Sequence, residues 1–421
     1  MEIVKDLLAK DDGWPFPGLI GVVEVPVVRP DGTVLEEAGY DPTTKLIYCP
    51  ASGLQCPSIP RSPSPGEIDW ARELIKEMIG DFPFASSASK TNAIAALLTP
   101  IVRPLIPGPT PLGLLDAPMP GTGKGLFAEC VGLVATGRSA ALMTAPDTED
   151  EWRKRITATL LEGATMITID NLEGKLESPS VASALTSPSW KDRILGVTKN
   201  AELPQRASWL ATGNNIVLGG DLPRRCYLIR IDAKTSKPWE RGGWRHPELR
   251  RWVAEHRGEL IGALLMLVRA WYSSGRPDYV VPMLGAFESW CGTVGNILSH
   301  AGYAAFLGNQ QDLYDDNDSD GCQWEAFFEA WDSAFDDRQI TVSEVIRELA
   351  TNFDLRDAIP DWLADSYYRD PGKFRQQLGQ ALLRQRGAQY SLWRLERTGT
   401  NRRKVALWRM VHVPEAKDQA A

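Results

Sequence analysis

Residues 111–130 constrain the fold of this 421-residue chain more than any other stretch. They run from an apolar segment, LGLLDA, through a glycine-rich turn, PMPGTGKG, into a helical pattern, LFAECVGLVATG. A lysine between two glycines, after a strand and before a helix, is typical of a phosphate-binding loop, in which backbone N–H groups and the lysine contact phosphates. The turn departs from G-x-x-x-x-G-K-[ST] twice, since Pro118 replaces the first glycine and Gly125 replaces the hydroxyl residue that contacts Mg²⁺.

The same turn is also compatible with a dinucleotide-binding fold. Gly121 and Gly123 match the first half of G-x-G-x-x-G, and Asp147 lies at a distance suited to the acid that contacts the ribose. However, Leu126 stands at the third glycine, and Asp147 lies in APDTED, which is typical of a helix start. A lysine inside the turn suits a triphosphate better. We therefore expect a nucleotide-phosphate loop made of Pro120, Gly121, Thr122, Gly123, Lys124, Gly125 and Leu126.

The residues after the loop repeat a pattern of short apolar strands and helices up to residue 232. The strand-like segments are SAALMTA, ATMITID, RASWLATGNN and CYLIRID, and helical patterns lie between the first ones. Strand, crossover helix and strand in repetition predict an α/β fold with a mainly parallel sheet.

Three further groups of polar residues follow strands of this predicted sheet. Asp170 ends the buried strand MITID, the place where an NTPase positions Mg²⁺, often through water. Asn214 and Asn215 end the strand WLATG, and an amide there can orient an attacking water. Arg224 and Arg225 precede the strand CYLIRID, where paired arginines are either surface charge or, in a ring of NTPases, a group that reaches a neighbour's γ-phosphate.

These elements, in this order, resemble the AAA+ module of replicative helicases from phages and mobile genetic elements, a group similar to superfamily 3 and MCM-like helicases and often associated with a primase. The resemblance also includes an N-terminal β segment with GYD, LTPIVRPLI before the loop, and a tryptophan-containing helical segment. It implies a DNA helicase that uses ATP and Mg²⁺ and translocates on DNA as a homohexameric ring. Lys124 matches the Walker A lysine and Asp170 the Walker B acid. Asn214 or Asn215 matches the sensor-1 amide, and Arg224 or Arg225 the arginine finger.

Two departures from the resembled group affect the chemistry. Gly125 lacks the Mg²⁺-contacting hydroxyl, and Asn171 stands where many AAA+ enzymes have a catalytic glutamate, although Glu173 is close by. The alternative function is therefore an ATP-binding initiator, loader or DNA-remodelling switch with little hydrolysis.

The domain organisation predicted from composition and patterning has an α/β AAA+ P-loop core between smaller parts. A β-rich accessory unit and linker occupy 1–66, with a hairpin at Pro30-Asp31-Gly32, and a helical lead-in occupies 67–110. The ATPase core is expected at 111–235. The parts expected after it are a helical segment at 236–311, an acidic linker at 312–323, and a winged-helix domain with a tail at 324–421.

Two regions are candidates for binding single-stranded or forked DNA. The first is a hairpin-like run before the sensor strand, where helicases of the resembled group carry a channel hairpin; Lys199 would lie at its tip, with Lys191 and Arg193 in support. The second is the basic C-terminal region, where a helix followed by two strands suggests a winged helix. Its candidate residues are Lys373, Arg375, Arg402, Arg403 and Lys404. Ordinary surface charge and a protein-binding role remain the alternatives.

Composition narrows the class of protein but not its partner. A formal net charge of −8 argues against a generally basic nucleic-acid coat, yet it allows a local basic surface. The six cysteines are scattered without a C-x-x-C pair, so we expect free thiols rather than zinc or disulfides. No apolar run is long enough for a membrane span, and we expect a cytoplasmic protein without a membrane partner. No primase domain is visible in this sequence, so any priming activity is expected in another, separately encoded chain or in a missing portion of this one.

Overall fold

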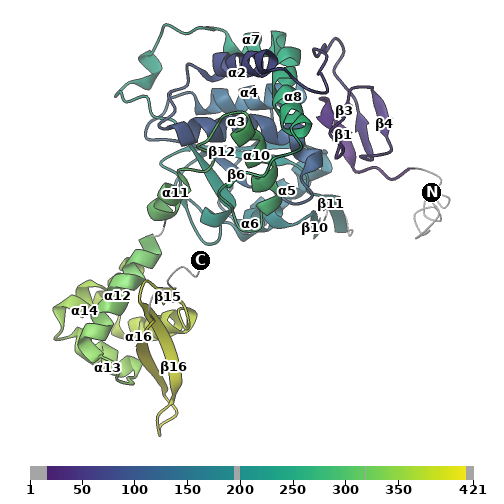
Figure 1. Cartoon of the computed structure of the whole chain (residues 1–421). Coiled ribbons are helices and arrows are strands. Elements are labelled where there is room, and N and C mark those ends of the chain that lie inside the picture. Colours follow the sequence, from purple (N-terminus) through teal and green to yellow (C-terminus); the bar gives the residue numbers. More distant parts are fainter. Residues whose placement is uncertain (1–16, 194–199, 318, 414–421) are drawn as a thin grey trace. The chain divides into compact units, whose positions relative to one another are not determined.

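The computed structural model describes residues 17–193, 200–317 and 319–413 (Figure 1). The chain forms two compact units, Met1–Tyr314 and Asp315–Ala421. The second has a hydrophobic core of its own, while the first has two clusters on the two faces of one sheet. None of the helices among the described residues is long and apolar enough to cross a membrane.

Five parallel strands form the central sheet of the first unit, which confirms the predicted α/β fold. They are β6 (Leu112–Ala117), β7 (Ala141–Thr144), β8 (Met166–Leu172), β12 (Ser208–Asn214) and β14 (Cys226–Arg230). The order is β14-β6-β12-β8-β7, and each neighbouring pair is parallel. In the dinucleotide order 3-2-1-4-5-6, the second strand lies beside the first. Here β7, the next strand after β6, is separated from it by β12 and β8, so the topology excludes the dinucleotide alternative.

Helices cover both faces of this sheet, because its strands alternate apolar side chains toward each face. On one face, α3 (Ser87–Val102), α4 (Lys124–Thr136) and α8 (Arg257–Ser273) pack in a common core with Leu115, Leu210 and Ile229 of the strands. On the other, α5 (Glu149–Leu161) and α6 (Pro179–Thr186) pack with Leu114, Ile169 and Ala211. The sheet is thus the middle layer of three.

The N-terminal β-rich part packs on the first face of this layered core. It contains β1 (Gly21–Val23), β2 (Val27–Val28), β3 (Val34–Leu35), β4 (Gly39–Asp41) and β5 (Leu46–Tyr48). Strands β2 and β3 form the hairpin predicted at Pro30-Asp31-Gly32, with Val27 opposite Leu35. Val27 and Val28 are fully buried in the same core as α3 and α8. The residues expected as a linker also pack there, since a Cβ at Gly258 of α8 would lie 1.8 Å from the carbonyl oxygen of Gln55.

The lead-in and the helical segment complete the first unit. α2 (Pro65–Ile79) begins with a capping box between Ser64 and Glu67, and it packs on α8. Beyond the sheet lie α7 (Leu249–Glu255), α9 (Glu288–Trp290), η4 (Cys291–Gly295), α10 (Asn296–His300) and α11 (Gln310–Asn317). Short elements flank the core: η1 (Arg103–Leu105), β9 (Lys175–Leu176), β13 (Val217–Leu218), η2 (Pro223–Arg225) and η3 (Pro238–Glu240).

The second unit combines five helices with a small antiparallel sheet. The helices are α12 (Ser319–Phe335), α13 (Val342–Leu349), α14 (Phe353–Asp357), α15 (Asp361–Arg369) and α16 (Pro371–Arg384). The sheet has the order β15-β16-β17, made of β15 (Gln389–Tyr390), β16 (Trp393–Thr400) and β17 (Ala406–His412). Residues 312–323, expected as a solvated linker, are helical on both sides of position 318. Their apolar neighbours explain this, because Leu313 is buried in the first unit and Trp324 in the second.

Candidate functional site

The glycine-rich turn lies between the end of β6 and the first turn of α4. Gly121 and Gly123 have φ of +76° and +101°, a conformation that glycine adopts at little cost. Gly123 is the N-cap residue of α4, so the free N–H groups of the first helical turn face the turn itself. A Cβ at Gly121 would lie 3.2 Å from the Cβ of Trp239, so Trp239 backs the turn closely. This is the backbone of an anion-binding loop.

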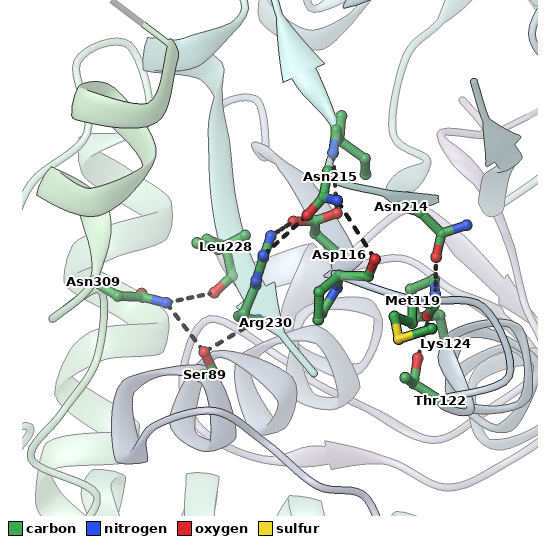
Figure 2. Close-up of polar contacts among 12 residues, drawn as sticks. Ser89, Asp116, Met119, Thr122, Lys124, Asn214, Asn215, Leu228, Arg230 and Asn309 are labelled. Carbon is green, nitrogen blue, oxygen red and sulfur yellow. Dashed lines mark hydrogen bonds and ion pairs between the residues drawn. The ribbon is translucent and has the colours of Figure 1, made fainter. Parts of the chain in front are cut away.

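Lys124 is buried and its ammonium group is already engaged within the loop (Figure 2). Nζ donates to Asn214 Oδ1 at 2.8 Å, and to Met119 O and Thr122 Oγ1 at 3.3 Å each. Burial lowers the pKa of Lys124, while the charge of Asp116 opposes this shift. The structure therefore brings two residues predicted from the sequence, the loop lysine and a strand-end amide, into direct contact.

Asp170 lies at the same edge of the sheet and is held by Thr212. Thr212 Oγ1 donates to Asp170 Oδ1 at 2.7 Å and accepts the Asn171 N–H at 2.9 Å. The register of β8 and β12 shifts at this point, so that Ala211 pairs with Ile169 and Gly213 with Leu172. Two residues of β8 thus face one of β12, as in a β-bulge, and Asn171 takes a φ of +52°. Its amide donates to Glu173 Oε1 at 3.1 Å, both side chains being exposed.

Asn215 is fixed by a buried ion pair that connects three segments (Figure 2). Asp116, the penultimate residue of β6, pairs with Arg230 at the end of β14. Asp116 Oδ1 also accepts the Ile216 N–H at 3.0 Å, and Arg230 Nη2 donates to Asn215 Oδ1 at 3.1 Å. Asn215 in turn donates from its backbone to Ala117 O at 3.0 Å. The Asp116–Arg230 pair therefore holds the Asn214–Asn215 turn beside the phosphate loop.

The Asp116–Arg230 ion pair is partly desolvated, so the loss of either partner would be costly. Only 5% of the Asp116 side chain and 30% of the Arg230 side chain are exposed. Burial raises the pKa of Asp116, whereas the Ile216 N–H and the charge of Arg230 act in the opposite direction. The positive charge of Arg230 thus favours the ionised form of this buried carboxyl group.

A further set of polar contacts leads from Arg230 to the end of the first unit (Figure 2). Ser89 Oγ accepts the Arg230 N–H at 3.1 Å and an Asn309 amide N–H at 3.1 Å. Asn309 also donates to Leu228 O at 3.3 Å, and Gln310 donates to Cys226 O at 3.0 Å. The chain that enters α11 is therefore attached to carbonyl groups of β14.

The two candidate finger arginines have different surroundings. Arg225 is held in place: it pairs with Asp221 and donates to Ala182 O and to Thr186 Oγ1, and 15% of its side chain is exposed. Arg224 pairs with the same Asp221, but 61% of its side chain is exposed. The structure assigns Arg225 to packing within the chain and leaves Arg224 as the accessible one of the two.

A hollow of about 340 Å³ adjoins the loop. Pro118, Met119 and Thr122 form one side, and the segment from Asp232 to Ser236 with Pro238 forms the other. A volume in this range suits a small organic ligand. Phosphates at the loop would have room for an attached group on this side.

The hairpin predicted before strand β12 is observed as two paired strands. The residues between these strands, 194–199, lie outside the described residues. Strand β10 (Ser189–Arg193) pairs antiparallel with β11 (Asn200–Pro204). Trp190 anchors its base, with Nε1 donating to Thr157 Oγ1 at 2.8 Å. Lys191 pairs with Glu202 across the hairpin at 3.0 Å, while Arg193 is exposed at the last described position. Lys199, the expected tip, lies outside the described residues.

The basic residues predicted in the second unit lie on two neighbouring elements. Lys373 and Arg375 are exposed on α16, with Arg375 donating to Ser343 Oγ at 2.8 Å. The β16–β17 turn exposes three consecutive cations, Arg402, Arg403 and Lys404. Asn401 shapes this turn by accepting the N–H groups of Arg403 and Val405 at 2.9 and 3.1 Å. A groove of about 480 Å³ lies between α16 and the hairpin.

Within the described residues, no group of three or more His, Cys, Asp or Glu side chains could hold a metal ion. A metal at the loop would thus have Asp170 as its carboxylate ligand and would need further oxygens from water or a bound phosphate, as Mg²⁺ commonly does. The six cysteines form no disulfide among the described residues.

Comparison with known proteins gives likeness of shape only. No protein-family model and no curated protein matches the chain. Among solved structures, the apo C-terminal region of NrS-1 covers 98% of this chain and 89% of its own length, with 13% identity and a TM-score of 0.42. The JCV helicase covers 59% of this chain and 72% of its own, with 11% identity and a TM-score of 0.27. Because these identities and TM-scores are low, the chemistry of the site is argued from the residues of this chain alone.

Three residues of the site did not stand out in the sequence. Asp116 and Arg230 each lie near the end of an apolar strand, in LGLLDA and CYLIR, and their pairing follows from β6 and β14 being neighbours. A charge ending an apolar strand was the available signal. Thr212 gave no signal, because threonine is ordinary in a strand.

Replacing Arg230 tests whether the Asp116–Arg230 ion pair stabilises the Asn214–Asn215 turn. Arg230→Met should lower the free energy of unfolding by about 2–4 kcal/mol near neutral pH, since it leaves Asp116 buried and unpaired. Without Arg230 the pKa of Asp116 rises further, so the folded variant takes up a proton more readily than the unfolded chain. The deficit relative to the unsubstituted protein should therefore shrink as pH falls toward 5.

Denaturant unfolding at several pH values measures this effect. Arg224→Met is the matched control, because its exposed ion pair with Asp221 should contribute less than about 1 kcal/mol. Equal losses of unfolding free energy in the two variants would contradict the stabilising role of the Asp116–Arg230 pair. A loss in Arg230→Met that does not change with pH would also contradict it.

Proposed function

We propose that this chain is an ATP-dependent DNA helicase, a translocase with an AAA+ P-loop core that acts as a ring with ATP sites between subunits. The observation that carries the proposal is the convergence of the loop, Asp170 and Asn214 at one edge of the sheet, with Lys124 Nζ bonded directly to Asn214 Oδ1. Parallel strands present their carboxyl ends to ligands at such an edge.

ATP would bind with its phosphates in the loop. The N–H groups at the start of α4 and Lys124 would contact the β- and γ-phosphates, and the hollow beside Asp232–Ser236 would receive the rest of the nucleotide. Because Lys124 already donates to Asn214, a phosphate that attracts the lysine would compete with Asn214 for the same ammonium group. Asn214 would thus respond to whether a γ-phosphate is present.

Asp170 would hold Mg²⁺, directly or through water, with its orientation set by Thr212. Mg²⁺ would neutralise the developing charge on the phosphates. Gly125 offers no hydroxyl to the metal, and Asn171 offers no carboxylate to the attacking water. Glu173, linked to Asn171, is the acid we assign to polarise that water.

A neighbouring subunit would complete the site with Arg224. Its exposure favours a contact outside its own chain, whereas the bonds of Arg225 are satisfied within it. An arginine supplied in this way stabilises the charge of the transition state. The homohexameric ring itself is carried over from the resemblance stated above.

DNA would contact two regions of the chain. The β10–β11 hairpin would project its outer end into the ring channel, with Arg193 and Lys199 toward the phosphates; Lys191 is occupied with Glu202. In the second unit, α16 and the β16–β17 hairpin would act as a winged helix, with α16 facing the groove and Arg402, Arg403 and Lys404 touching the backbone. Replication of a phage or mobile element, with a primase encoded separately, is the setting that the resemblance suggests.

A second candidate function is an ATP-binding initiator or loader that hydrolyses little. Gly125 and Asn171 favour it, because both remove oxygen ligands that hydrolysis usually employs. The rate of ATP turnover on DNA separates the two.

The role of the loop in ATP hydrolysis can be tested by removing the ammonium group of Lys124 and by adding a hydroxyl group at Gly125. Lys124→Ala should reduce DNA-stimulated ATP turnover by about a hundredfold or more. Gly125→Thr should raise turnover or lower the Mg²⁺ requirement, since a Cβ at Gly125 meets nothing within 4 Å and the hydroxyl restores a metal ligand. Steady-state ATPase assays with a Mg²⁺ titration measure both. If the unsubstituted chain binds ATP but turns over no faster than Lys124→Ala, the helicase proposal fails and the loader stands.

The arginine assignment predicts different defects for the two neighbours. Arg224→Ala should cut turnover by about a thousandfold while leaving ATP binding and the unfolding midpoint unchanged. Arg225→Ala should instead lower the free energy of unfolding by about 1–3 kcal/mol, because it removes the two hydrogen bonds that Arg225 donates to Ala182 O and Thr186 Oγ1.

Mixing Arg224→Ala with Lys124→Ala subunits then tests whether the finger acts between chains. Partial recovery of turnover is expected at intermediate ratios. No recovery at any ratio would contradict an action in trans.

The hairpin prediction concerns the salt dependence of DNA binding. Arg193→Ala should weaken binding to single-stranded DNA and reduce the slope of log K against log salt by about 1, as one lost phosphate contact would. Fluorescence anisotropy over a salt series measures the slope. Lys191→Ala, whose charge is paired with Glu202, is the matched control and should change the slope less; an unchanged slope for Arg193→Ala would remove the hairpin from the DNA interface.

A further inference from the structure

A second, larger cavity lies at the edge of the sheet opposite the phosphate loop. Its volume is about 630 Å³, within the range of small-molecule sites. The segments before β8 and β12 contribute Thr165 and Arg206, the first residue of β12 contributes Ser208, η1 contributes Arg103, and β1 contributes Val22. We call it the amino-edge cavity. Strands of six or seven residues separate it from the loop by roughly 20 Å.

Two arginines give this cavity an unbalanced positive charge. Arg103 donates to two neutral carbonyl oxygens, Arg206 O at 3.2 Å and Ile106 O at 2.9 Å. Neither Arg103 nor Arg206 forms an ion pair with a carboxylate of the described residues, and no hydrogen bond from the Arg206 guanidinium to those residues is found. The remaining lining charges do not compensate, since Arg138 and Glu24 pair with each other and Glu162 is exposed.

The electrostatic cost of this arrangement is visible in both side chains. Burial lowers the pKa of Arg103 to about 10, and the positive charge of Arg206 adds to the shift. Burial also lowers the pKa of Arg206. Two partly desolvated guanidinium groups that repel each other are stabilised by an anion placed between them.

A hydroxyl in the same lining also lacks a partner. Ser208 is 6% exposed and lines the cavity, and its Oγ makes no hydrogen bond to any described residue. Buried hydroxyl groups are normally satisfied. Because the Ser208 oxygen is itself buried, it is an unsatisfied polar group behind the lining and does not face the open space of the cavity.

Part of the remaining lining is apolar, and the space is far larger than a single inorganic anion. Val22 is 45% exposed and Leu160 and Ala164 contribute further apolar surface. A ligand that fills the cavity would therefore combine an anionic group with an apolar body.

We propose that the amino-edge cavity binds a small organic anion, in which a phosphate or carboxylate contacts Arg103 and Arg206 and an apolar body contacts the Val22 side of the cavity. The site is separate from the nucleotide loop and does not depend on the proposed helicase function. Phosphate and carboxylate share the geometry that guanidinium groups recognise, so the two are distinguished by titration.

Isothermal titration of the full chain with 1-naphthyl phosphate tests the proposal, with 1-naphthoate as the carboxylate arm. At least one of the two should bind saturably with one site per chain. Neutral 1-naphthol and inorganic phosphate should each bind about tenfold or more weakly, because each lacks one half of the recognised ligand. Failure of both naphthyl anions to bind, or equal binding of 1-naphthol, would overturn the proposal.

Variants place the probe in the cavity. Arg206→Met should weaken binding by about tenfold or more, and it removes no hydrogen bond that the guanidinium makes within the described residues. Val22→Glu should also weaken binding by charge repulsion, at an exposed position that tolerates substitution. The control Arg251→Met, on α7 and 78% exposed, should leave affinity unchanged.

The phosphate loop is the alternative location for such a probe. Lys124→Ala should leave the affinity for 1-naphthyl phosphate unchanged, and saturating ADP should not displace it. Loss of binding in Lys124→Ala, or unchanged binding in both Arg206→Met and Val22→Glu, would assign the probe elsewhere and overturn the amino-edge site. Circular dichroism and thermal unfolding confirm that each variant is folded.

Discussion

The position of β12 between β6 and β8 is the constraint on which the candidate site depends. Because the three strands are parallel, their carboxyl ends share one edge, and Lys124 and Asn214, which are 90 positions apart in the chain, meet there. Lys124 reaches Asn214, and Thr212 orients Asp170, only because β12 has a neighbour on each side. A sheet in which β6 and β8 were adjacent would separate the Asn214–Asn215 turn from the loop.

The loop shows how a departure from a motif can leave its geometry intact. Gly121 and Gly123 provide the backbone conformation, and Lys124 is in place, so the absence of a hydroxyl at Gly125 concerns the metal alone. The open space at this position means that no packing requirement keeps glycine there. The residue that most limits the chemistry is thus among the easiest to change.

Sequence patterning predicted the parallel sheet, the loop and the strand-end polar residues, because each depends on local periodicity or on a turn. It did not reveal the Asp116–Arg230 pair or the role of Thr212, since these depend on which strands are neighbours and on a register shift between Ala211 and Gly213. Sequence also could not separate Arg224 from Arg225, whose surroundings come from Asp221 and the end of α6. The packing of residues within 51–67 and 312–323, both expected as linkers, was hidden for a related reason: polar and proline-rich composition obscured the few apolar residues that pack.

The attachment of Asn309 and Gln310 to carbonyl groups of β14 has a mechanical consequence. A load transmitted along the chain from the second unit would act on β14 through these two hydrogen bonds. That strand follows Arg224 and ends at Arg230, which holds the turn beside the loop. Tension on β14 would therefore act on Arg224 and on the Asn214–Asn215 turn together.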